Sequence, residues 1–102
     1  MRVITRKRLR AFAQNHPDAA GALQKWYRLV REAQWENLLD VRRVYPHADM
    51  VTVGSGNSVT VFNICGNKYR LITAIHYNRQ RVYILVLLRH AEYSKNFWKD
   101  RL

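Results

Sequence analysis

Hydrophobic residues in the first third of the chain recur at intervals of three and four, which is the spacing of one helix face. The longest stripe consists of Ala19, Leu23, Trp26, Val30 and Ala33. It predicts a helix that starts at Pro17, because proline suits a first helical position. We expect a short strand at residues 1–4 before it. An earlier helix should follow this strand, with Thr5 as its N-cap, and reach about Asn15.

A third helix is expected between Asn37 and Pro46. Asn37 and Asp40 have the spacing of a capping box, and Pro46 stops the helix. Beyond this point the hydrophobic pattern changes from helical spacing to alternation. The alternation predicts strands at residues 51–53, 59–64, 68–77 and 81–89.

Two turn signals join these strands. Gly66-Asn67 has the composition of a two-residue hairpin loop, and residues 78–80 form the next turn. Residues 90–97 are polar enough to be a short helix or an ordered tail. Helices followed by an antiparallel meander indicate one α+β domain over residues 1–102, in which the N-terminal helices pack on one face of a small antiparallel sheet.

Strand alternation also predicts what each face of the sheet carries, because neighbouring residues point to opposite faces. The most apolar face consists of Val82, Ile84, Val86 and Leu88, which must pack against a core. The opposite face carries Lys68, Arg70, Ile72, Ala74 and His76 on one strand and Arg81, Tyr83, Leu85, Leu87 and Arg89 on the next. We therefore expect one core face and one basic, partly aromatic face, although an ordinary solvated face has the same pattern.

Charge favours the functional interpretation of that face. The chain has 18 lysines and arginines against 7 acids, for a formal net charge of +11. Such an excess of positive charge indicates a polyanionic partner. Nucleic acid is the first expectation and the phosphates of a membrane are the second. No helix-turn-helix pair or zinc finger is recognisable for the major groove of DNA, whereas exposed aromatic residues and arginines on a sheet suit single-stranded RNA.

Several classes of protein are excluded or disfavoured. Cys65 is the only cysteine, so disulfides and cysteine-based zinc sites are excluded. The longest apolar run, 82–88, is far shorter than a membrane span, and the N-terminal residues have no apolar signal core. We expect a cytoplasmic protein without a membrane partner, metal or cofactor.

Several motifs carry a resemblance to a known family. They are Val61-Phe62-Asn63, Gly66-Asn67-Lys68-Tyr69-Arg70 and His90-Ala91-Glu92-Tyr93, with Arg2-Val3-Ile4, Asp40-Val41 and Pro46-His47-Ala48-Asp49 before them. Together they resemble the HigB-type toxins of type II toxin–antitoxin systems, within the RelE-like superfamily. The chain departs from the family pattern at two positions. It has Ser94 where many relatives have an acidic residue, and Arg89 where threonine is common.

The resemblance implies a RelE-like fold and cleavage of mRNA, often on the ribosome. It also implies a helix-turn-helix antitoxin that neutralises the toxin and represses the operon with it, so that DNA is contacted only through that complex. Metal-free cleavage needs a base for the 2′-hydroxyl, an acid for the 5′-oxygen and cations for the phosphate.

We expect His90 to be the general acid or base, because histidine titrates near neutrality. Arg70 would clamp the scissile phosphate, Lys68 on the same face would add charge, and Tyr93 would stack a base or relay a proton. Further RNA contacts are expected from Arg81, Tyr83, Arg89 and Lys95.

Each candidate also has a structural alternative. His90 would cap the last helix, Arg70 would pair with Glu92 or Asp49, and Tyr93 would pack against the sheet. His16, His47 and His76 carry no special claim. For the whole chain, the alternatives to a ribonuclease are a non-catalytic RNA- or ribosome-binding module and a degenerate toxin that retains antitoxin binding.

Overall fold

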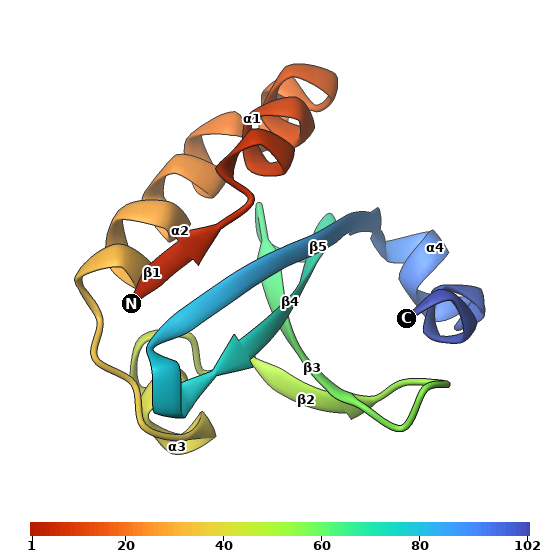
Figure 1. Ribbon diagram of the computed structural model, residues 1–102. Coiled ribbons are helices and arrows are strands. Elements are labelled where there is room, and N and C mark those ends of the chain that lie inside the picture. The colour runs from red at the N-terminus through yellow and green to blue at the C-terminus, as the bar shows by residue number, and fades with distance from the viewer.

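The computed structural model describes residues 1–102. Helices lie on both sides of one sheet, the N-terminal ones on the left and the C-terminal segment on the right in Figure 1. The helices are α1 (Arg6–Asn15), α2 (Ala20–Glu32), α3 (Leu38–Val44) and α4 (His90–Ser94), with 3₁₀ turns η1 (Pro17–Ala19), η2 (Tyr77–Arg79) and η3 (Phe97–Arg101). The strands are β1 (Arg2–Ile4), β2 (Asp49–Thr52), β3 (Ser58–Ile64), β4 (Tyr69–His76) and β5 (Arg81–Arg89).

The five strands form one sheet in the order β1-β5-β4-β3-β2. Strands β2 to β5 form the antiparallel meander that the alternation predicts. Strand β1 pairs in parallel with β5, with Arg2 opposite Arg81, so the whole sheet is mixed. The predicted α+β class with N-terminal helices on one face is confirmed. The parallel edge was not foreseen, because three residues of strand carry no signal of their pairing partner.

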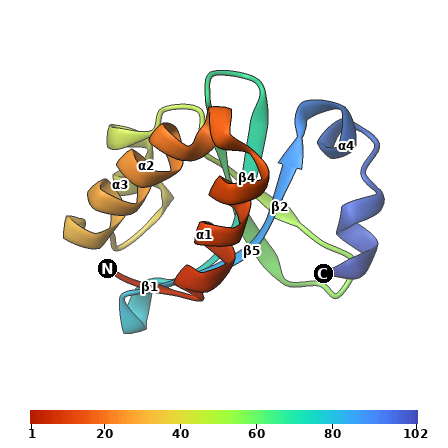
Figure 2. The ribbon, with the colours of Figure 1, turned by 90° about the horizontal axis from the view of Figure 1, so that it is seen from above.

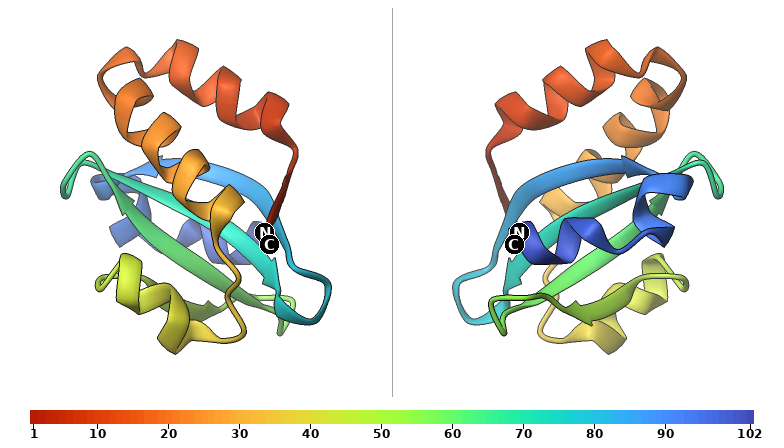
Figure 3. Two further views of the ribbon diagram at one scale, coloured as in Figure 1. Left: turned by 90° about the vertical axis from the view of Figure 1, so that its left-hand side faces the viewer. Right: turned by 90° about the vertical axis from the view of Figure 1, so that its right-hand side faces the viewer.

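Helices α1, α2 and α3 cover one face of the sheet, and the C-terminal segment covers the other (Figures 2 and 3). The larger core lies under the helices and is centred on Phe62, which has no exposed surface. Trp26 and Tyr45 meet the Phe62 ring edge-on at 5.4 Å each, and Trp35 stacks on it at 6.2 Å. The helical stripe predicted from the sequence supplies this core through Leu23, Trp26 and Val30.

The second face of the sheet is not the open basic surface that strand alternation predicts. It carries a second cluster of buried residues: Val53, Val59, Val61, Ile72, Leu88 and Trp98. Trp98 comes from η3 and lies over these aliphatic side chains. The turn before β3 holds η3 in place, since the N–H of Gly54 donates to the carbonyl of Lys99 at 2.8 Å. The prediction was wrong because the valines of β2 and β3 make this face apolar as well.

A β-bulge in β5 also changes which face of the sheet its later side chains point to. Ile72 lies opposite Val86 and Thr73 lies opposite Ile84, so Leu85 is an extra residue on β5. Beyond the bulge the alternation is reversed. Val86 and Leu88 therefore face the second cluster, and Leu87 faces the helices. Of the four aliphatic residues predicted to share one face, Val82 and Ile84 face the helices together, whereas Val86 and Leu88 face the other side.

Two local predictions hold only in part and one is confirmed. Thr5 is the N-cap residue of α1, as predicted, but its side chain makes no capping hydrogen bond. Its backbone is left-handed (φ 68°), and its hydroxyl contacts the carbonyls of Ile4 and Ile84 instead. The hairpin loop has four residues, 65–68, and its left-handed positions are Cys65 and Gly66. The cap of α3 is as predicted, because the Asn37 side chain accepts from the N–H of Asp40 at 3.0 Å.

Candidate functional site

The candidate site lies where β5 ends and β4 begins. Helix α4 starts directly after β5, and Glu92 turns back to accept the N–H of Arg89 at 3.2 Å. The N–H of His90 donates to the carbonyl of Lys68 at 3.0 Å, which fixes the first residue of α4 beside the hairpin. The backbone of His90 is thus held at the sheet end, while its side chain is exposed.

Arg70 holds the His90 ring. One terminal nitrogen of its guanidinium lies 3.2 Å from His90 Nδ1 and donates to Asn67 Oδ1 at 2.8 Å. The other terminal nitrogen donates to the carbonyls of Asn67 and Tyr69 at 3.0 and 3.1 Å. Arginine is only a donor, so Nδ1 must accept, and the ring then carries its proton on Nε2. The sequence places both residues in one site, and the structure brings them into contact.

These contacts change the role expected of Arg70. Only 8% of the residue is exposed, and both terminal nitrogens are engaged by protein acceptors. A guanidinium in this state orients His90, whereas a phosphate clamp needs free donors. The alternative ion pairs with Glu92 and Asp49 are not formed, since Asp49 pairs with Arg42 at 3.5 Å.

Tyr93 lies one turn after His90 and packs inside the same site. Its ring is 5.6 Å from the guanidinium carbon of Arg70 and stacks on Trp98 at 5.3 Å. Burial, reinforced by the negative charge of Asp49, raises the pKa of Tyr93 above its ordinary value, although Arg70 opposes this shift. The phenol therefore keeps its proton near neutrality, which suits a hydrogen-bond donor and not a base.

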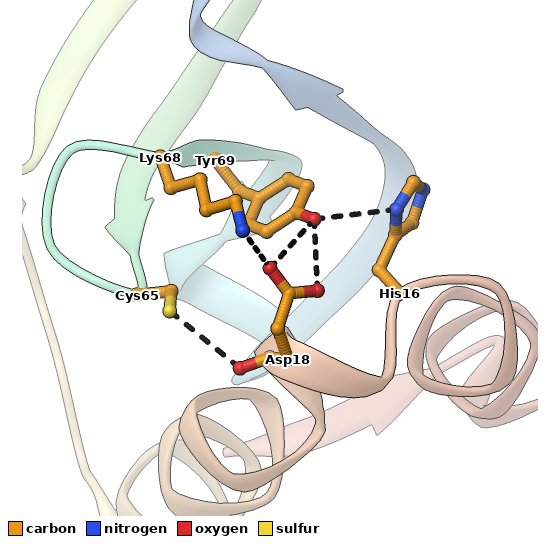
Figure 4. A network of polar contacts seen from close by, with 5 residues as sticks. All are labelled: His16, Asp18, Cys65, Lys68 and Tyr69. Carbon is orange, nitrogen blue, oxygen red and sulfur yellow. Dashed lines mark hydrogen bonds and ion pairs between the residues drawn. The ribbon is translucent and has the colours of Figure 1, made fainter.

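Lys68 is on the other side of the sheet from Arg70, contrary to the expectation that they share a face. It lies in the loop before β4, where strand alternation does not apply, and its ammonium contacts the carboxylate of Asp18 (Figure 4). The hydroxyl of Tyr69 donates to the same carboxylate at 3.0 Å and lies 3.4 Å from His16 Nδ1. The Lys68 hydrogen bond holds the pKa of Asp18 below its ordinary value, and Asp18 raises the pKa of Lys68.

This group of His16, Asp18, Lys68 and Tyr69 was not foreseen as a unit. Asp18 and His16 are about 50 positions before Lys68 in the chain, and a turn context alone gave no reason to connect them. Their contact depends on the packing of η1 against the hairpin, which is a tertiary feature. The group lies on the helix side of the strand ends that carry His90.

The residues expected to bind RNA are spread over the molecule. Arg81 and Tyr83 lie at the start of β5, about 30 and 23 Å from His90 at roughly 3.3 Å per residue. Arg89 is paired in register with Tyr69, which belongs to the helix-side core. Lys95 borders a hollow beside Trp98. The structure therefore brings together His90, Arg70 and Tyr93, and it separates them from Arg81 and Tyr83.

Two further properties bear on the type of site. Histidine, cysteine, aspartate and glutamate side chains gather nowhere in groups of three or more that could hold a metal ion. No helix of the protein combines the length and apolar character needed to cross a membrane.

A small basic α+β domain with helices on a five-stranded mixed sheet is compatible with the fold of the RelE-like toxins as a class. The model of the HigB toxin family, described as the RelE-like toxic component of a toxin–antitoxin system, matches residues 19–96. The chain belongs to this family, and the resemblance drawn from its motifs is confirmed.

Individual relatives match over nearly the whole chain. An mRNA interferase HigB from Escherichia coli O6:H1 (strain CFT073) is 27% identical over 95 residues, which cover 93% of this chain and 90% of the relative. The mRNA interferase toxin HigB of Escherichia coli K12 and an mRNA interferase HigB of Shigella flexneri are each 25% identical over 94 residues, covering 92% of this chain and 88% of the relative.

Proposed function

We propose that this toxin is an endoribonuclease that cleaves mRNA and thereby inhibits translation. The observation that carries the proposal is the exposed imidazole of His90, fixed at the sheet end by the buried guanidinium of Arg70. The relatives that match in sequence over almost the full length are named mRNA interferases, which supports the same substrate. The net charge of +11 supplies the attraction for RNA phosphates.

The chemistry proposed is attack of a 2′-oxygen on the neighbouring phosphorus. A bond forms between the 2′-oxygen and phosphorus, the bond to the 5′-oxygen breaks, one proton leaves the 2′-hydroxyl and one reaches the 5′-oxygen. The products are a 2′,3′-cyclic phosphate and a 5′-hydroxyl end. No metal is required, since protein groups supply the proton transfers and the charge stabilisation.

His90 has two states in this scheme. While Nδ1 accepts from Arg70, the ring is neutral and Nε2–H is a hydrogen-bond donor for the negative charge that grows on the phosphate. His90 accepts the 2′-hydroxyl proton at Nδ1 once that nitrogen is released from Arg70, and the protonated ring then gives a proton to the 5′-oxygen. Arg70 thus sets the position of the ring before the proton transfers. The protonated phenol of Tyr93 is a second donor, and the exposed Arg89 adds positive charge at the end of β5. The charge of Lys68 is paired with Asp18 and is not counted in this scheme.

The proposal extends to partners and place of action. The substrate is mRNA in the cytoplasm, engaged on the ribosome. A helix-turn-helix antitoxin neutralises the toxin, and DNA is contacted only by the complex of the two. Family membership supports an antitoxin partner.

Cleavage by purified protein tests the chemistry. We expect mRNA bound to purified ribosomes to be cut with 5′-hydroxyl ends, and we expect one 2′-deoxy nucleotide at the cut position to prevent cleavage there. Cleavage that leaves 5′-phosphate ends, or that proceeds at the 2′-deoxy position, would show that the proposed chemistry is wrong.

A further inference from the structure

A cavity lies beside the candidate site, on the side away from α4. Its volume is about 560 Å³, within the range of small-molecule sites. Its walls come from the loop between α3 and β2 (residues 45–48), from Asn63 near the end of β3, and from Gly66 and Asn67 of the hairpin. These segments include three of the motifs that carry the family resemblance, and the proposed chemistry uses neither His47 nor Asn63.

The cavity is joined to His90 through one guanidinium. Asn67, which lines the cavity, accepts from the same Arg70 nitrogen that contacts His90 Nδ1. Asn63 lies directly opposite Arg70 in the sheet, so the two side chains leave the same face. A nucleotide whose phosphate is at His90 can therefore place a neighbouring base in the cavity.

The lining has the chemistry that recognises a base. The side chain of Asn63 makes no hydrogen bond within the protein although it is only partly exposed, which leaves a donor and an acceptor on one planar amide. The ring of His47 is also free of protein hydrogen bonds, and it is exposed next to Pro46. Single-stranded RNA is recognised in this way, with bases stacked on flat side chains and hydrogen-bonded along their edges.

We propose that this cavity binds one base of the mRNA adjacent to the scissile phosphate, with Asn63 on the base edge and His47 on its face. The inference rests on the proposed ribonuclease function and goes beyond it, because it assigns the base preference of cleavage to these two residues. The base is unstacked from its neighbours when it enters the cavity, so cleavage favours single-stranded positions.

The test compares cleavage positions across a pool of mRNAs with randomised coding sequence, translated on purified ribosomes. Wild-type protein, Asn63→Leu and His47→Ala are used, with Asn57→Leu as a matched control in the exposed turn before β3. The frequency of each base is counted at every position around the cut. In wild type and the control, one position next to the cut should favour particular bases. Asn63→Leu should reduce that preference about tenfold, as expected for loss of a two-point contact with a base edge, and His47→Ala should also weaken it.

The outcomes separate this inference from the proposed function. An unchanged base distribution in both Asn63→Leu and His47→Ala, or a wild type without any preference near the cut, would overturn the base pocket and leave the ribonuclease in place. Failure of the wild type to cut any RNA would overturn the proposed function and the pocket with it. Because the measured quantity is a ratio of bases among cuts, a lower overall rate in a variant does not imitate the expected result.

Discussion

Replacement of Arg70 by lysine tests whether the guanidinium acts through His90 or directly on RNA. Lysine keeps the positive charge, but a single ammonium cannot reach the two carbonyls and also join Asn67 to His90. At least two of the four hydrogen bonds are lost, at about 0.5–1.5 kcal/mol each. We expect the free energy of unfolding to fall by about 2 kcal/mol, which lowers the melting temperature by roughly 8–16 °C in a domain of this size.

Arg70→Lys should slow cleavage even though it leaves the charge of the site unchanged. A misplaced reacting group costs up to about 100-fold in rate, so we expect a loss of roughly 10- to 100-fold in cleavage below the melting temperature of the variant. The nitrogen chemical shifts of a labelled His90 ring provide a second measurement. They should show the proton on Nε2 in wild type and a mixture of both neutral forms in Arg70→Lys.

If Arg70→Lys cleaves RNA at the wild-type rate with unchanged His90 shifts, positive charge alone suffices and the guanidinium does not position the imidazole. Arg79→Lys is the control, since Arg79 is exposed in η2 beside the other end of β5 and should change neither measurement.

Three further predictions concern stability and binding. Asp18→Asn should be less stable than wild type at neutral pH, and the difference should shrink below about pH 4. Lys68 lowers the pKa of Asp18, so the stabilisation is present above the ordinary pKa of an aspartate and is lost as pH falls through the lowered pKa. Urea unfolding at a series of pH values measures this difference in stability, and a difference that does not change with pH would refute the ion pair. Trp98→Ala should cost about 3 kcal/mol in the free energy of unfolding because Trp98 is 6% exposed, whereas Phe97→Ala, at 72% exposed, should cost under about 0.5 kcal/mol. RNA binding by His90→Ala protein should weaken about 50-fold between 50 and 200 mM salt if roughly four phosphates are neutralised, and a flat salt dependence would remove the charge argument.

The parts of the fold that local sequence specifies could be predicted. The helical stripe of α2, the Asn37 cap and the four-strand meander each depend on neighbours within a few residues. The missed features depend on residues far apart in the chain. The bulge at Leu85 has no composition signal, yet it moves Val86 and Leu88 to the opposite face.

The candidate site could be predicted in the same partial way. Arg70, His90 and Tyr93 were found because they belong to motifs that resemble a family, and their contact follows from the register of β4 and β5. The partner of Lys68 could not be found, because Asp18 reaches it only after η1 packs on the hairpin. The engagement of Arg70 by main-chain carbonyls was equally beyond sequence reasoning, since carbonyl positions depend on the loop conformation.

The most direct test of the account is a primer-extension map of mRNA in bacterial cells that express this chain. Wild type is compared with His90→Ala and with His76→Ala, an exposed histidine at the far end of β4. The account predicts new discrete 5′ ends with wild type and His76→Ala, and their disappearance with His90→Ala at equal expression. The same ends from His90→Ala would move the chemistry away from His90. The absence of new ends and of growth arrest with well-expressed wild type would contradict the ribonuclease and favour a binding module or a degenerate toxin.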